Sequence, residues 1–311
     1  MTTQLQTTLD SQGTWSSTAN LLKARYEGAR KLCFILSIVA ALLAAVASQL
    51  PDSNTDTRLG SLRLWLAVGS AVLLALVSLF TIRFVTGKND AWGRARSASE
   101  ALKRIAWTYA GAAAPYDNPS TREEQLKTDR QKIEDGVDDL SGVQAGPSAH
   151  GAASASPQPS QATTRADYVR LRAEWQQKWY LDHAVKSSRE ARILRRYEFA
   201  LALVATVLTA LIGVSGKTPL PIVKNLSVDL VALTGVITTV SGAIVAYIEA
   251  SRLDFLVTSY RAAARQLKEL LAAVPEESAT SDMWSAYVQK AENVVATENG
   301  AWMAKLGKAR D

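Results

Sequence analysis

The chain has 311 residues, a formal net charge of +6 and one cysteine, Cys33, so an intramolecular disulfide is excluded. Its apolar residues are gathered into four uncharged runs, separated by segments dense in charge, at residues 32–50, 64–82, 199–216 and 230–248. This distribution excludes a single large soluble core and favours four membrane spans. The cations lie mostly beside these runs, which favours a lipid bilayer as partner over nucleic acid.

Residues 1–140 are expected to form a first unit with two transmembrane helices, at about 32–50 and 64–84. Each run is long enough, at about 1.5 Å per residue, to cross the hydrocarbon layer of a bilayer. Ala45-Val46-Ala47 fits a signal-peptidase site, but the charged segment before the first run is too long for a signal peptide. We therefore expect this span to be retained.

Residues 141–164 hold small, polar and proline residues with little to bury, and they predict a disordered linker. Residues 165–311 are expected to form a second two-span unit, with spans at about 197–216 and 228–249. A shift of 165 residues lays the first half on the second, so that Arg30 falls on Arg195 and Arg96 on Arg261. The shared order of elements indicates an internal repeat.

Outside the spans, apolar residues recur at spacings of three and four, which predicts amphipathic helices that pack on one another. Pro115 and Pro275 stand after two of these patterns. A helical pattern also begins at Arg165, before the third span. The predicted buried positions are Trp92, Ala95, Ser99, Leu102, Ala106 and Tyr109; then Leu256, Tyr260, Ala263, Leu267, Leu270 and Val274; and, in a C-terminal amphipathic helix, Trp284, Tyr287, Val288, Ala291, Val294 and Val295.

Basic residues flank the same end of each pair of spans, and the positive-inside rule places that end in the cytoplasm. Both termini and the linker are then cytoplasmic, and the two hairpins are parallel repeats. The fold class predicted is an all-α membrane protein of two parallel two-span hairpins on long cytoplasmic helical stems. The expected inner-interface anchors are Arg30, Lys31, Arg83, Lys88, Arg189, Arg192, Arg195, Arg196 and Arg252.

Residues for catalysis or metal binding are scarce. His150 lies in the linker and His183 stands alone, which favours a stem-packing role for His183 over a ligand or a base. The segment Gly213–Thr218 ends like a phosphate-binding loop but lacks the first glycine of that motif, since Leu211 stands there. We expect no enzyme activity, no catalytic residue, no metal and no cofactor.

The fourth span carries a polar face that has two interpretations. Thr234, Thr238, Ser241 and Val245 share one side of the helix, beside Gly235, Thr239 and Gly242. Small residues and hydroxyls at such spacing favour close packing between helices. The same face would line a pore if several chains assembled, with Asp229 and Glu249 at its two mouths. Both interpretations stay open, and one multimer can satisfy both.

The layout of a basic stem, two spans, the segment Tyr260–Val274 and a helix containing Glu298–Met303 resembles the SLATT family. The lead-in Lys178–Arg196 is similar to the entry segment of that family. The first half, with Arg94–Tyr116, resembles a diverged second SLATT unit, although a family member usually has one hairpin.

The SLATT resemblance implies an effector of a prokaryotic conflict system that sits in the inner membrane and has no catalytic residues. Such effectors are thought to form pores when a partner senses infection, often through a nucleotide signal. The resemblance therefore implies a homo-oligomer, and a separate protein that makes or senses such a signal.

We therefore expect a multi-pass inner-membrane protein that oligomerises and permeabilises the membrane, causing growth arrest or death in antiviral defence. The alternative is a membrane-anchored scaffold or sensor whose helical stem docks a cytoplasmic partner. A small transporter is disfavoured, because no charged residue falls within a span to couple an ion.

Overall fold

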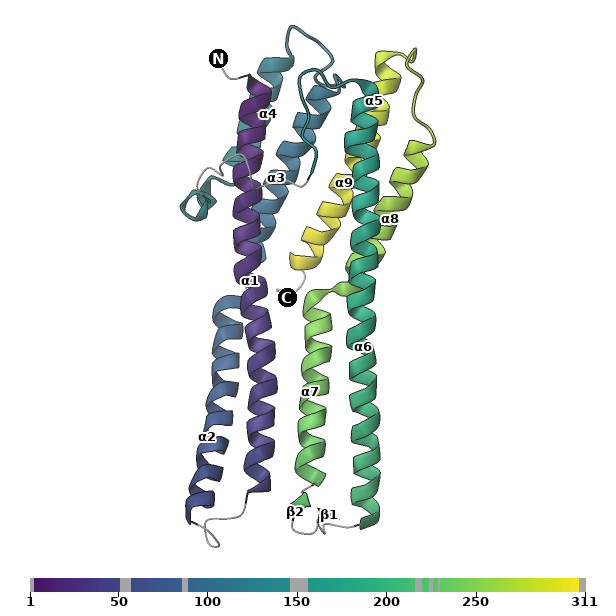
Figure 1. Ribbon diagram of the computed structural model, residues 1–311. Helices are drawn as coiled ribbons and strands as arrows, with labels where there is room; N and C mark the ends of the chain where they lie inside the picture. Colours follow the sequence, from purple (N-terminus) through teal and green to yellow (C-terminus); the bar gives the residue numbers. More distant parts are fainter. Residues whose placement is uncertain are drawn as a thin grey trace. The chain divides into compact units, whose positions relative to one another are not determined.

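The computed structural model describes residues 3–50, 57–85, 89–145, 156–215, 220–223, 226–228 and 230–307. These residues are almost wholly helical, which confirms the all-α class (Figure 1). The chain divides into two compact units. The stem unit comprises Met1–Tyr26, Gly87–Lys186 and Phe255–Asp311, and the span unit comprises Glu27–Thr86 and Ser187–Asp254. Each unit therefore draws on both halves of the sequence.

Two long helices take part in both units. Helix α1 runs unbroken over 46 residues, Gln4–Gln49, and helix α6 over 41 residues, Trp175–Ser215 (Figure 1). A π-helical turn, η3 at Val169–Glu174, and α5 at Arg165–Tyr168 precede α6 without a break. The helix predicted to begin at Arg165 is confirmed, and Thr164 caps it: its hydroxyl accepts the backbone N–H of Asp167 at 3.1 Å.

The span unit is completed by α2 at Thr57–Phe80, which ends in the π-helical turn η1 at Thr81–Val85, and by α7 at Leu230–Ser251. In the described residues four helices are long and apolar enough to cross a membrane, as predicted. At most 22% of the most apolar window of any of them is buried inside the chain, and none of the window in the third. Apolar surface on that scale costs about 25 cal/mol per Å² in water, so these helices require lipid or further protein around them.

Contacts inside the span unit join the helices both within and between hairpins. The hydroxyl of Ser70 on α2 donates to the carbonyl of Ala40 on α1 at 2.9 Å, which ties the first hairpin together. The rings of Phe34 on α1 and Tyr247 on α7 lie 5.2 Å apart between centroids. The first and fourth spans are therefore neighbours.

The connection between the third and fourth spans is not only a loop. Two short antiparallel strands, β1 at Leu220–Val223 and β2 at Leu226–Val228, pair there, with Leu220 opposite Val228.

The stem unit packs α3 (Asn89–Ala110), α4 (Arg122–Asp135), a 3₁₀ turn η2 (Asp138–Val143), α8 (Leu253–Leu271) and α9 (Ser281–Gly307) with its parts of α1 and α6. The predicted packing stripes are confirmed in most positions: every predicted position on α3 is buried, as are Tyr260, Ala263 and Leu267 on α8 and Trp284, Tyr287, Val288, Ala291 and Val295 on α9. Leu256, Leu270 and Val294 are half-buried and pack against the same cluster. Val274 is exposed, against the prediction, because α8 has already ended at Leu271.

Residues 146–155 of the predicted linker lie outside the described residues, which resume at Ser156. Its first residues belong to η2, whose Leu140 is buried with Trp15, Trp92 and Val137 in one apolar cluster of the stem unit. Burial of this leucine stabilises η2, although the prediction assigned the turn in part to a disordered linker.

Candidate functional site

The four residues predicted to line a pore lie on α7 of the span unit. Thr238 and Val245 are exposed, and Thr234 and Ser241 are half-buried. The buried side chains of the helix, Leu230, Ile244 and Ile248, belong to other positions. The predicted face therefore remains largely uncovered by the rest of the chain.

The polar groups on this face are satisfied within the helix. The hydroxyl of Thr234 donates to the carbonyl of Leu230, that of Thr238 to Thr234, and that of Thr239 to Gly235, each at 2.8 Å. A membrane helix can expose such threonines to lipid without leaving a hydroxyl unpaired. A Cβ built on Gly235 or Gly242 meets nothing within 4 Å. The glycines are thus not used for close packing inside one chain.

The two predicted mouths differ in what can be described. Glu249 is exposed near the end of α7, two residues before its last residue Ser251. Asp229 lies outside the described residues.

The predicted anchors are mostly exposed, as basic residues at a membrane interface are. Arg30 donates to the carbonyl of Ala250 at 3.0 Å and lies over the ring of Tyr247 at 5.1 Å, so it joins α1 to α7. Arg195 forms an ion pair with Asp254. Lys88 lies outside the described residues, and the exposed anchors are Lys31, Arg83, Arg189, Arg192, Arg195 and Arg196.

Arg252 is placed differently from the other anchors. It separates α7 from α8 with a positive φ of 51°, a conformation that costs a residue with a Cβ about 1 kcal/mol or more. The chain changes direction between the two helices at Arg252, although a glycine would adopt this φ without strain.

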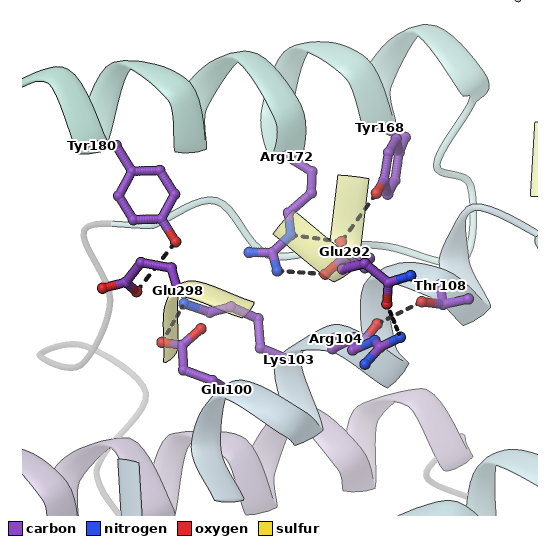
Figure 2. Close-up of polar contacts among 10 residues, drawn as sticks. Glu100, Lys103, Arg104, Thr108, Tyr168, Arg172, Tyr180, Glu292 and Glu298 are labelled. Atoms are coloured by element: carbon purple, nitrogen blue, oxygen red, sulfur yellow. Dashed lines mark hydrogen bonds and ion pairs between the residues drawn. The ribbon is translucent and has the colours of Figure 1, made fainter. Parts of the chain in front are cut away.

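The stem unit holds a buried polar cluster that sequence reasoning missed (Figure 2). Arg172 on η3 donates to both carboxylate oxygens of Glu292 on α9, at 2.9 and 2.7 Å, and only 4% and 1% of these side chains are exposed. The hydroxyl of Tyr168 donates to the same carboxylate at 3.0 Å. Burial opposes ionisation of Arg172, but the Glu292 carboxylate outweighs it and raises the pKa of Arg172 further.

Charged residues of α3 adjoin this cluster. Glu100 and Lys103 lie 3.8 Å apart, and Arg104 donates to Asn293 of α9 at 2.8 Å (Figure 2). Burial opposes ionisation of Glu100, but Lys103, Arg172 and Arg96 together lower the pKa of its carboxyl group. Burial lowers the pKa of Lys103. The cluster therefore keeps both signs of charge inside the stem unit.

A cavity of about 520 Å³ opens beside these residues. Side chains of α1, α3, α6 and α9 line it, so both halves of the sequence contribute. Among them are Arg96, Glu100, Trp179, His183 and Glu298. His183 stacks on Trp179 with centroids 3.8 Å apart, in line with the stem-packing role predicted for it.

The sequence did carry a signal for the cavity. Trp175, Trp179 and His183 recur at a spacing of four, as do Arg96 and Glu100, which puts aromatic and charged groups on single helix faces. Only the packing of four helices shows that these faces meet.

The part of the chain described here has no group of three or more His, Cys, Asp or Glu residues placed to hold a metal ion. The two candidate sites are therefore the uncovered face of α7 and the cavity of the stem unit.

Comparison with protein families identifies the second half of the chain. Residues 168–302 match the family described as SMODS and SLOG-associating 2TM effector domain 1, from the last residue of α5 into α9. Residues 168–302 form a SLATT domain.

The first half matches a different description. Residues 14–124, from within α1 into α4, match DUF4231, a family of unknown function. The resemblance to SLATT is thus confirmed for the second half, and a second SLATT unit in the first half stays a prediction. Comparisons with curated proteins and with solved structures gave no match.

The SLATT domain of this chain is an effector domain by its family description, and it supplies two of the four candidate membrane helices. The chain as a whole has the helices expected of a multi-pass membrane protein.

Proposed function

We propose that the protein oligomerises in the inner membrane of a prokaryotic cell and permeabilises it, as the effector of a defence system. The family description of the SLATT domain, an effector associated with SMODS and SLOG, supports the class of function. No catalytic residue is assigned in this proposal, and the partner is a separate protein that makes or senses a nucleotide signal.

The observation that carries the proposal is the uncovered small-residue face of α7. Gly235 and Gly242 have open space where a Cβ would stand, and Thr238 and Val245 are exposed. Small residues on a membrane helix favour close approach of another helix. Since no described residue of another helix of the same chain lies within 4 Å of a Cβ built on these glycines, a second copy is the natural partner for this face, and the hydroxyls beside it are suited to a wetted lining.

The orientation and domain division proposed here are those predicted from the sequence. Both termini and residues 141–164 face the cytoplasm, and units 1–140 and 165–311 are tandem hairpins. The exposed arginines near the predicted inner ends of the spans support this orientation.

Membrane potential, measured with a voltage-sensitive dye in bacteria that express the chain from a tight promoter, tests the proposal. We expect rapid depolarisation before growth arrest, and we expect Thr238→Leu and Ser241→Leu to prevent it without lowering membrane abundance. Thr206→Leu on α6 is the matched control, because Thr206 is also exposed and bonds the carbonyl four residues before it, Ala202, at 2.9 Å.

Depolarisation that is unchanged in both α7 variants would remove this face as the lining. The membrane potential could instead stay full while the protein is abundant in the membrane and the separate signalling protein is co-expressed. That result would favour the membrane-anchored scaffold. One observation supports that second function: Arg261 and Arg265 are exposed on α8, whose opposite side is buried. Charge reversal at these two arginines should then release a docked partner.

A further inference from the structure

The cavity of the stem unit has an aromatic wall built by α6. Trp175, Trp179 and His183 lie one helical turn apart, and both tryptophans are only half-buried although their side chains are large. Trp179 is held by His183, stacked at 3.8 Å, and by the ring of Tyr260, edge-on at 5.5 Å. A preordered aromatic surface of this kind binds planar rings by stacking.

The lining of the cavity also holds two buried acceptors that have no hydrogen-bond donor among the described residues. Glu298 is 5% exposed, and its Oε1 is buried without a hydrogen-bond partner among the described residues. Its Oε2 accepts a long bond of 3.5 Å from the hydroxyl of Tyr180. The Oδ1 of the next residue, Asn299, is also buried and unpartnered within the described part of the chain. A buried acceptor without a donor costs about 1–3 kcal/mol, which a ligand with N–H groups would recover.

Cationic side chains complete the lining. Lys23 from α1 and Arg96 and Lys103 from α3 face the cavity, against the carboxylates of Glu100 and Glu298. Burial raises the pKa of Glu298, although Arg96 opposes this, so the negative charge on that side is weakened. A ligand that carries both an anionic group and N–H donors would match this mixed lining.

We propose that the cavity of the stem unit binds a purine nucleotide. The base stacks on Trp179 and donates to Glu298, and the phosphate lies by Arg96 and Lys103. Guanine is favoured over adenine, because its ring N–H and amino group donate side by side to a carboxylate. The cavity volume of about 520 Å³ is within the range of about 300–1,000 Å³ that is common for small-ligand sites.

This inference goes beyond the proposed function and does not rest on it, because binding is measured on the purified full chain in detergent. Isothermal titration compares guanosine 5′-monophosphate with adenosine 5′-monophosphate, guanosine and inorganic phosphate. We expect saturable binding of the guanine nucleotide, about tenfold tighter than that of the adenine nucleotide and of either fragment.

The variant Glu298→Gln should weaken the binding of guanosine 5′-monophosphate about tenfold and leave the binding of adenosine 5′-monophosphate almost unchanged. The control is Glu269→Gln, at an exposed position of α8 in the same unit, which should bind as the parent chain does. The unfolding temperature of each variant, measured beside the titrations, checks that the variant is folded.

Three results would overturn the proposal. They are no saturable binding of guanosine 5′-monophosphate, inorganic phosphate that binds as tightly as the nucleotide, and a Glu298→Gln variant that binds like the control. The second would reveal a general anion patch, which needs neither the aromatic wall nor the acceptors.

Discussion

Removal of Arg172 tests whether the buried ion pair holds the stem unit together. In Arg172→Met, the Glu292 carboxylate stays buried at 1% exposure and keeps only the hydroxyl of Tyr168 as a described partner. Loss of one member of a buried pair costs about 3–5 kcal/mol, because the charge that remains is uncompensated. For a unit of this size each kcal/mol lowers the melting temperature by about 2–4 °C, so we expect a decrease of about 6–20 °C.

The double variant Arg172→Met/Glu292→Leu separates the net contribution of the ion pair to stability from the cost of leaving one buried charge without a partner. Replacement of both partners by apolar side chains of similar size is often neutral or stabilising by about 1–4 kcal/mol, so most of the lost stability should return. The assay is thermal unfolding of the full chain in detergent, followed by tryptophan fluorescence, since Trp107 and Trp284 are buried in the same unit. A double variant as unstable as the single one would refute the reasoning, and so would a single variant that melts with the parent.

Three further predictions use single positions. Gly242→Leu should lower the oligomer mass in detergent, measured by light scattering, while the free energy of unfolding of one chain stays within about 0.5 kcal/mol of the parent's, because a Cβ there meets nothing within 4 Å. Arg252→Gly should be more stable than Arg252→Ala by about 1 kcal/mol and so unfold at a higher temperature, since only glycine accepts the φ of 51° without strain. Glu298→Gln should be more stable than the parent at pH 8, with the difference closing toward pH 4.5. Burial raises the pKa of Glu298, so the parent loses stability as pH rises above 4.5, the ordinary pKa of a glutamate side chain. Melting curves of the two proteins, recorded in parallel across pH, measure this difference.

Helical periodicity alone was enough to predict most of the stem unit. The positions Trp92, Leu102 and Ala106 were predicted from spacings of three and four, and all are buried in the structure. The four spans could be predicted equally well, because an uncharged apolar run of this length is stable as a helix inside a membrane. Local rules of this kind depend on residues close in sequence, so they survive without knowledge of the tertiary fold.

The buried polar cluster could not be predicted in the same way. Arg172 and Glu292 are 120 positions apart, and nothing near either residue marks it as buried. Between the two residues the chain runs through the span unit over Ser187–Asp254, so their helix faces meet only in the tertiary fold. Burial of a charged residue is rare without a partner, and the identity of that partner is a tertiary fact.

The two halves of the sequence are predicted to be repeats, whereas the structure groups helices from both halves into one stem unit and one span unit. Apolar surface alone could be buried by either half, since each has an amphipathic stem. Some buried polar groups, however, are paired across the halves: the indole N–H of Trp284 donates to the carbonyl of Gly111 at 2.7 Å, and the backbone N–H of Ala114 donates to the hydroxyl of Ser285 at 2.9 Å. The first half adds Glu100 and Lys103 to the same interior, and the cavity is lined by helices from both halves. Polar groups that must be satisfied far from water therefore give a physical reason why the two halves share one stem unit instead of forming two.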